Sequence, residues 1–215
     1  MKKATMHRVY LAAMILLYFV FLVLDLFFPQ AAALSDVLKW LGICLNFAGC
    51  AWTIRPYSLS DWHLTCTGLL LTVVCDFFLL FTTAYLWGVL LFILVQGQYL
   101  KRTGIHSVRF FYTAYIVLLA VSLFAETTKA FDPLYVVSAF YAFALFTVWV
   151  RSLHAPLPQK NRRAFFGGMS LFLLCDVNVA LTNLFSGDPF SSWFQFFMWF
   201  FYLPAQLLIA KSTEE

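Results

Sequence analysis

Long apolar runs separated by short polar breaks dominate this chain. A helix needs roughly 20 apolar residues to cross a hydrocarbon core of about 30 Å, and backbone exposed to lipid must satisfy its own hydrogen bonds. Eight runs qualify, and we expect each to form a transmembrane helix. The break near Thr83 carries no charge and is the weakest boundary. The predicted helices are Val9–Phe28, Ser35–Ile54, Leu64–Thr82, Ala84–Leu100, Arg109–Thr127, Pro133–Leu153, Arg163–Phe185 and Phe190–Ala210.

The composition agrees with a membrane protein. Of the 215 residues, 63% are hydrophobic and only 11% are charged, whereas about a quarter are charged in a soluble domain. We therefore predict an all-α polytopic membrane protein, with residues 1–215 forming one transmembrane domain. The first run is too long for a cleavable signal and no small-residue cleavage site follows it. The five cysteines fall inside apolar runs, so we interpret them as packing residues without disulfides.

The basic residues predict the orientation in the membrane. With the N-terminus in the cytoplasm, only Lys39 and Lys129 of the 14 lysines and arginines lie outside. This positive-inside bias favours eight crossings with both termini in the cytoplasm, and we expect a bacterial cytoplasmic membrane. Topology and anionic lipid account for the net charge of +4, so no nucleic-acid partner is expected.

Two aspartates lie deep inside apolar runs. They are Asp76 in "LTVVCDFFLL" and Asp176 in "LFLLCDVNVA". An ionisable group at membrane depth costs roughly 2.5–3.5 kcal/mol and is a functional candidate by default. Each lies about a dozen residues into a helix that runs outward, roughly 18 Å up, so we expect the two to face each other across the bundle. The alternative is that each only hydrogen-bonds a neighbouring helix.

A shared spacing relates the two halves of the chain. Gly68 and Gly168 each precede the aspartate of their own run by eight residues. This spacing suggests that residues 1–104 and 105–215 are parallel repeats. Further polar residues fall near the same depth or on the aspartate stripe, and their alternative role is packing between helices. They are Asn46, Gln96, Asn178, Tyr202 and Asn183.

Other kinds of catalytic site have no signature in this sequence. Nothing resembles a nucleophile elbow, a phosphate loop or a zinc motif. The four histidines map to cytoplasmic ends or loops, away from the aspartates. We therefore expect neither a metal ion nor a cofactor.

Five local patterns, in order, resemble the YhhN-like lysoplasmalogenase family of eight-helix membrane proteins. These are the lysine of "DVLKWL", the aspartate segment "GLLLTVVCDFFLL", the Gly88, Phe92 and Tyr99 frame of "GVLLFILVQGQY", the second aspartate segment "GGMSLFLLCDVNVAL", and the ending "YLPAQLLIA". The sequence departs from the family at Gln96, where many members have histidine. It also departs at Thr182 and Asn183, which replace a polar-basic pair.

The resemblance implies hydrolysis of the vinyl ether bond of a lysoplasmalogen, a lysophospholipid substrate within the bilayer. It makes Asp76 and Asp176 the acid and base, because two carboxylates in a low-dielectric cavity do not both stay ionised cheaply. Lys39 either pairs with the substrate phosphate or is an interfacial lysine that reaches toward solvent. The remaining candidate substrate-binding residues are Asn46, Gln96, Tyr99, Asn183, Tyr202 and Gln206.

Three rival functions remain open at this stage. A transporter or proton-coupled carrier of a lipid or small amphiphile also uses paired intramembrane carboxylates. A non-catalytic membrane assembly factor needs them only for stability. A related hydrolase would cleave a different lipid ether or amide. The sequence does not choose among lipid substrates or specify the oligomeric state.

Overall fold

The predicted all-helical architecture is confirmed. The computed structural model describes residues 2–105 and 107–215, with side chains from residue 5 onward. Over these residues the chain forms eight α-helices and a short 3₁₀ helix, η1. The elements are α1 (Lys2–Phe27), η1 (Pro29–Ala31), α2 (Ala32–Trp52), α3 (Leu59–Phe81), α4 (Tyr85–Arg102), α5 (Arg109–Thr128), α6 (Leu134–Ser152), α7 (Gln159–Leu184) and α8 (Ser191–Lys211).

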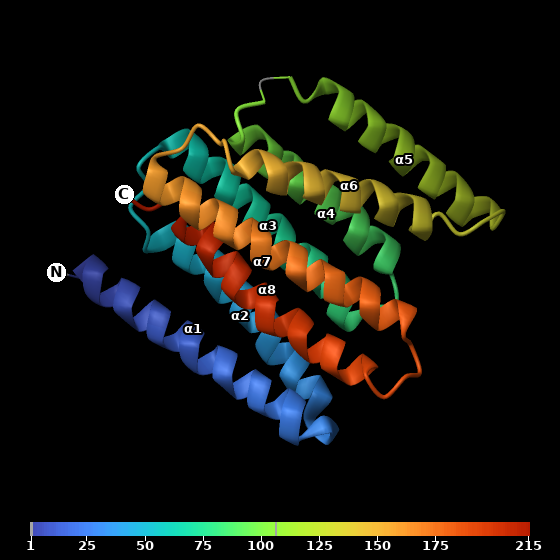
Figure 1. The fold of residues 1–215 in the computed structure, drawn as a ribbon, viewed down its shortest axis with the longest axis horizontal. Helices are drawn as coiled ribbons and strands as arrows, with labels where there is room; N and C mark the ends of the chain where they lie inside the picture. The colour runs from blue at the N-terminus through green and yellow to red at the C-terminus, as the bar shows by residue number, and fades with distance from the viewer. Residues whose placement is uncertain (1, 106) are drawn as a thin grey trace.

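Seven of these helices are long and apolar enough to cross a membrane on their own, and α4 is the exception. Its 18 residues include Gln96, Gln98, Lys101 and Arg102. However, α4 packs against α3, α5 and α6, and runs alongside them in the bundle (Figure 1). Protein covers much of its surface, so α4 does not need the apolar composition that lipid contact requires.

Six helices close a ring around the interior. In order around the ring, α2 packs on α3, α3 on α4, α4 on α6, α6 on α7, α7 on α8 and α8 on α2. The other two helices lie outside it, α1 against α2 and α8, and α5 against α4, at opposite margins of the bundle (Figure 1). Because α1 and α5 present mostly exposed apolar side chains, they face lipid and the ring holds the core.

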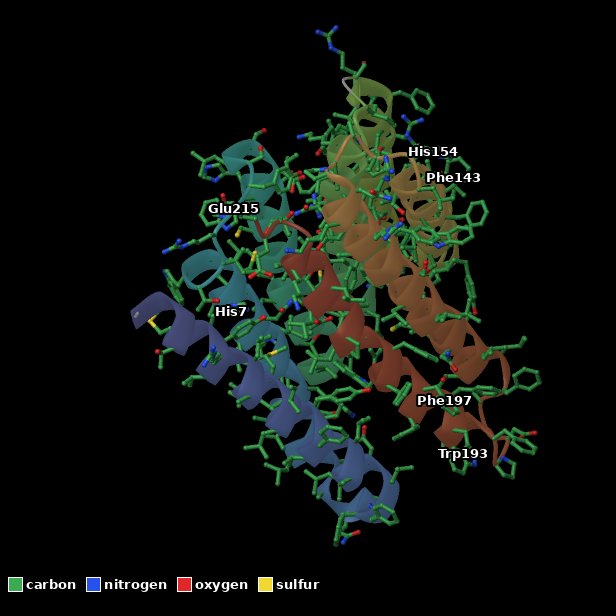
Figure 2. All side chains as sticks on the ribbon, turned by 60° about the vertical axis from the view of Figure 1, so that its left-hand side comes forward. His7, Phe143, His154, Trp193, Phe197 and Glu215 are labelled. Atoms are coloured by element: carbon green, nitrogen blue, oxygen red, sulfur yellow. The ribbon has the colours of Figure 1, made fainter. Side chains whose placement is uncertain are left out.

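Both termini lie at one end of the bundle (Figure 1). His7 approaches Glu214 at 3.8 Å, and the Glu215 backbone N–H donates to the Arg55 carbonyl at 2.9 Å. Figure 2 shows His7 and Glu215 at this end and Trp193 at the opposite one. An even number of helices produces this arrangement, and we call this the inner end because the basic residues predict it to be cytoplasmic.

The helices that carry the two aspartates begin earlier than the apolar pattern predicts. α3 begins at Leu59 rather than Leu64, because the Ser58 side chain caps it by accepting from the Asp61 backbone N–H. α7 begins at Gln159 rather than Arg163, directly after Pro158. Polar residues extend both helices beyond the apolar run, so hydropathy alone places their starts too late.

Candidate functional site

Asp76 is buried in the interior of the helix ring. It lies on α3, and its side chain is only 3% exposed. The Tyr202 hydroxyl on α8 donates to both of its carboxyl oxygens, at 3.0 and 2.9 Å. A buried carboxyl group needs such a donor, because leaving it unpaired in an apolar interior is costly. The contact joins a helix of the first half of the chain to the last helix.

Asp176 has a tyrosine of its own. It lies on α7, at the same distance from the helix start as Asp76 on α3, since residues 59 to 76 and 159 to 176 span equal lengths. The Tyr141 hydroxyl on α6 donates a short hydrogen bond to its Oδ2 atom. Asp176 is less buried than Asp76. The two carboxyl groups therefore have equivalent partners in slightly different surroundings.

A row of aromatic rings connects the two tyrosines across the interior. Tyr141 contacts Phe92 at 5.8 Å between ring centroids, Phe92 contacts Phe172 at 5.9 Å, and Phe172 contacts Tyr202 at 5.6 Å. The four aromatic residues come from four of the six helices that enclose the interior. The row shows that the two aspartate–tyrosine pairs border one apolar interior rather than two separate ones.

Asp76 and Asp176 lie on different helices of the ring, α3 and α7. Their helices, α3 and α7, make no extended packing contact with each other over their described lengths; α4 and α6 separate them on one side of the helix ring, and α2 and α8 on the other. The row of aromatic rings between their tyrosines, rather than packing of α3 on α7, connects the two acids.

Glycines set the close helix contacts around this site. A Cβ at Gly168 would lie 3.0 Å from the Ala205 carbonyl and 3.0 Å from the Ile209 nitrogen, so α7 touches the backbone of α8 here. A Cβ at Gly68 would lie 2.7 Å from the Tyr99 ring. Small residues at such positions let membrane helices approach closely. The glycine eight residues before each aspartate is therefore a packing position.

A proline inside α8 lies close to Tyr202. Pro204 has no backbone N–H, so it cannot bond the Phe200 carbonyl one turn earlier. The Tyr18 hydroxyl of α1 donates to that carbonyl instead, at 2.9 Å. The interruption in α8 is thus satisfied by a neighbouring helix, as required in a membrane.

A comparison with known proteins bears on this geometry. The model of the YhhN family matches residues 34–213. The chain belongs to the YhhN family. No match was found among curated proteins or among solved structures. The suspected resemblance is confirmed at the level of the family, and the match covers both aspartates and both tyrosines that hold them.

Four other predicted site residues of this YhhN-family protein are fully buried in the bundle. Asn46, Gln96, Tyr99 and Gln206 all have 0% exposure. Over the described residues, both polar atoms of each glutamine side chain, Asn46 Nδ2 and the Tyr99 hydroxyl lack hydrogen-bond partners. With Tyr202, five of the seven predicted substrate-binding residues therefore lie in the interior.

The remaining two predicted substrate-binding residues lie elsewhere. Asn183 is exposed in the last turn of α7 and donates to the Val179 carbonyl of its own helix. Lys39 is buried at the outer end of α2, where it pairs with Asp25 at 3.1 Å and Asp36 at 3.2 Å. Lys39 thus does not extend to solvent, and its charge is neutralised by two carboxylates.

Sequence reasoning missed Tyr141, the partner of Asp176. It stands in an apolar stretch of α6, seven residues after Leu134. Tyrosines in membrane proteins concentrate at the interfaces, so a tyrosine well inside a predicted helix is the signal that was available. Tyr202 was predicted as a site residue from its depth, whereas Tyr141 was not.

A surface hollow of about 370 Å³ lies at the outer end of the bundle, away from the aspartates. It is bordered by the α3–α4 connection, the end of α5 and the start of α6, with Trp87, Glu126 and Asp132 among its lining residues. Because neither carboxyl group of the buried pair lines it, we place the candidate site at the aspartates, where buried polar groups converge.

Proposed function

We propose that this YhhN-family membrane protein hydrolyses the vinyl ether bond of lysoplasmalogens in a bacterial cytoplasmic membrane. The products are a fatty aldehyde and a glycerophospho-base. Family membership supports hydrolase-like chemistry, and the aspartate pair supports this particular reaction. The observation that carries the proposal is two carboxyl groups inside the helix ring, each held by a tyrosine hydroxyl, with one row of aromatic rings connecting the two tyrosines.

The reaction needs an acid and a base that exchange roles. One aspartic acid protonates the alkenyl carbon remote from the ether oxygen, which leaves an oxocarbenium ion beside the other carboxylate. Water adds to the carbon bound to oxygen and gives its proton to that carboxylate, forming a hemiacetal. The newly protonated acid then donates to the glycerol oxygen as the C–O bond breaks. The first aspartate takes the hemiacetal hydroxyl proton, which releases the aldehyde and restores the pair.

The surroundings of the pair suit this substrate. The alkenyl chain lies among the aromatic rings of Phe92 and Phe172, where apolar burial favours it. Tyr141 and Tyr202 hold the two carboxyl groups in place, so less reorganisation is needed when the positive charge develops. Glycosidases divide labour between two carboxyl groups in a similar way, and they too pass through an oxocarbenium-like state.

Aldehyde release tests the proposal directly. The purified protein in lipid nanodiscs is given lysoplasmenylethanolamine, and the aldehyde and the remaining lipid are followed by mass spectrometry. We expect release by the wild type and at least a roughly hundredfold loss in Asp76→Asn and in Asp176→Asn, as for removal of a general acid or base. Asp188→Asn, in the exposed loop before α8, is the control and should keep full activity.

The rival functions give different results in the same assay. A lipid carrier leaves the substrate intact. A hydrolase of another lipid class cleaves the alkyl-ether or amide-linked lysophospholipid analogue instead of the vinyl ether. Full aldehyde release in both Asp→Asn variants, with intact folding by size-exclusion chromatography, would remove the pair from the mechanism.

A further inference from the structure

Two fully buried glutamines have no protein partner. Gln96 on α4 and Gln206 on α8 both have 0% exposure, and over the described residues neither Nε2 nor Oε1 of either side chain has a hydrogen-bond partner. An unpaired buried polar group costs about 1–3 kcal/mol, so four such atoms require an explanation.

The two amides lie at the same level between their helices. At the inner end, Arg102 of α4 donates to the Ser212 hydroxyl just after α8, at 3.0 Å. Gln96 and Gln206 each stand six residues before their member of this pair, which is about 9 Å along each helix. The two helices are connected at the inner end, and each glutamine lies the same distance from that connection. Gln96 and Gln206 therefore lie at equal depth.

A second connection between α4 and α8 lies further toward the outer end of the bundle. Phe92, four residues before Gln96, and Tyr202, four residues before Gln206, both pack against the ring of Phe172. The glutamines are therefore enclosed between two levels at which α4 and α8 are connected. This places both amides in one layer of the interior, not on separate faces of the bundle.

Further unpaired donors approach this layer from other positions. Asn46 Oδ1 accepts from the Tyr10 hydroxyl at 2.9 Å, which fixes the amide and leaves its Nδ2 unpaired. The Tyr99 hydroxyl has no partner at hydrogen-bond distance, and its polar neighbour Thr72 donates to the Gly68 carbonyl, which leaves the Thr72 oxygen able to accept. The same region thus contains both donors and acceptors that lack a hydrogen-bond partner.

We propose that the amides of Gln96 and Gln206 hold an internal water site next to Asp76, which stores the water consumed in hydrolysis. The chemistry of the layer selects water, because a water molecule both donates and accepts and typically makes about three hydrogen bonds when buried. An anion would satisfy the amide nitrogens and leave both amide oxygens unpaired. A lipid chain would satisfy none of these groups.

The position of the site gives it a role in the reaction, and this role rests on the proposed function. Gln206 is one helical turn from Tyr202, which holds Asp76. Water held there reaches the oxocarbenium carbon from the inner side of the carboxyl pair, while the alkenyl chain occupies the aromatic side. Water supply and lipid entry then do not compete for one opening.

X-ray radiolytic hydroxyl labelling tests the water site without any substrate, because ordered water beside a buried side chain makes that side chain reactive. We expect Tyr99 to be labelled rapidly in the wild-type protein despite its burial. Phe21 is as buried, with rings for neighbours, and should stay unlabelled. Labelling of Tyr99 as slow as that of Phe21, after correction for intrinsic reactivity, would overturn the proposal.

Substitution of the amides supplies the second measurement. Gln96→Leu and Gln206→Leu should slow the labelling of Tyr99, and should lower kcat about tenfold or more with little change in KM, since a lost hydrogen bond to reacting water acts on the chemical step. Gln98→Leu is the matched control, because Gln98 on the same helix already bonds the Tyr112 hydroxyl. Unchanged labelling in both amide variants, or a raised KM with normal kcat, would show that these amides do not hold the water.

The two proposals fail in different ways. A labelled Tyr99 in a protein that leaves lysoplasmenylethanolamine intact would refute the proposed function and keep the water site. Aldehyde release by a protein with an unlabelled Tyr99 would keep the proposed function and refute the water site. The wild-type labelling decides even where an amide variant fails to fold.

Discussion

The Tyr202 hydroxyl donates to both carboxyl oxygens of Asp76 across a separation of 126 residues. This contact ties α8 to α3 in the interior, and the Tyr141 contact with Asp176 does the same for α6 and α7. Each acid is thus held from a neighbouring helix, so its position depends on the closed ring of helices rather than on its own helix alone.

Tyr202→Phe should distinguish the role of the Tyr202 hydroxyl in positioning Asp76 from the role of its ring in packing. The substitution keeps the ring that packs against Phe172 and Trp199 and removes the hydroxyl. We expect aldehyde release to fall about tenfold to hundredfold, and the free energy of unfolding to fall by about 1–3 kcal/mol, because a buried carboxyl group loses its donor. Kinetics and thermal unfolding in detergent measure the two effects.

Tyr141→Phe is the companion variant, and Tyr135→Phe is the control because Tyr135 is 81% exposed on the same helix. Wild-type kinetics in both Tyr202→Phe and Tyr141→Phe would contradict the positioning role.

Gly168→Ala should destabilise the protein, whereas the adjacent Gly167→Ala should not. The new Cβ at Gly168 meets backbone atoms of α8 at 3.0 Å, which cannot move away without shifting that helix. We expect a loss of about 1–3 kcal/mol, typical of overpacking. At Gly167 the nearest atom is a Leu208 methyl at 3.6 Å, an ordinary contact. Thermal unfolding of both variants measures the difference, and equal midpoints would show that α7 and α8 are not in close backbone contact.

Breaking the Arg102–Asp61 pair should be among the most destabilising changes at the inner end. Arg102 Nε and Nη2 donate to the two Asp61 oxygens at 2.8 Å, and the arginine side chain is fully buried. Asp61→Asn or Arg102→Met leaves a buried charge unpaired, which costs about 3–5 kcal/mol.

Replacing both partners of this pair removes the unpaired charge and should recover much of the loss, which unfolding of the single and double variants in detergent measures. Glu126→Gln breaks the exposed pair with Lys129 and serves as the control, with an expected change near zero. A double variant as unstable as the worse single one would mean that the pair is not coupled in this way.

Lys39→Met should act on stability rather than on substrate binding. The lysine pairs with Asp25 and Asp36 and lies 5.3 Å from the Trp199 ring centroid, so a phosphate would have to displace a carboxylate. We expect a lower unfolding midpoint and a KM for lysoplasmenylethanolamine that changes by less than about twofold. A large rise in KM at unchanged stability would restore the predicted phosphate contact.

The sequence alone determined the eight helices and singled out the two aspartates as candidate site residues. Apolar runs of membrane length dictate helices because lipid offers the backbone no other hydrogen-bond partner. The same physics makes an aspartate in such a run conspicuous, since it is costly there. These are local properties of the chain, and the pattern of residues is enough to reveal them.

Only the tertiary structure decided which side chains meet. Tyr141 and Tyr202 looked alike in sequence, and their pairing with Asp176 and Asp76 follows from how six helices close a ring. Lys39, predicted to pair with a phosphate or to be an interfacial lysine, pairs with two carboxylates at the outer end, a contact that the sequence did not predict. Contacts between helices depend on the rotation of each helix about its own axis and on which helices become neighbours. Hydropathy predicts neither the rotation of a helix nor its neighbours, because packing between helices determines both.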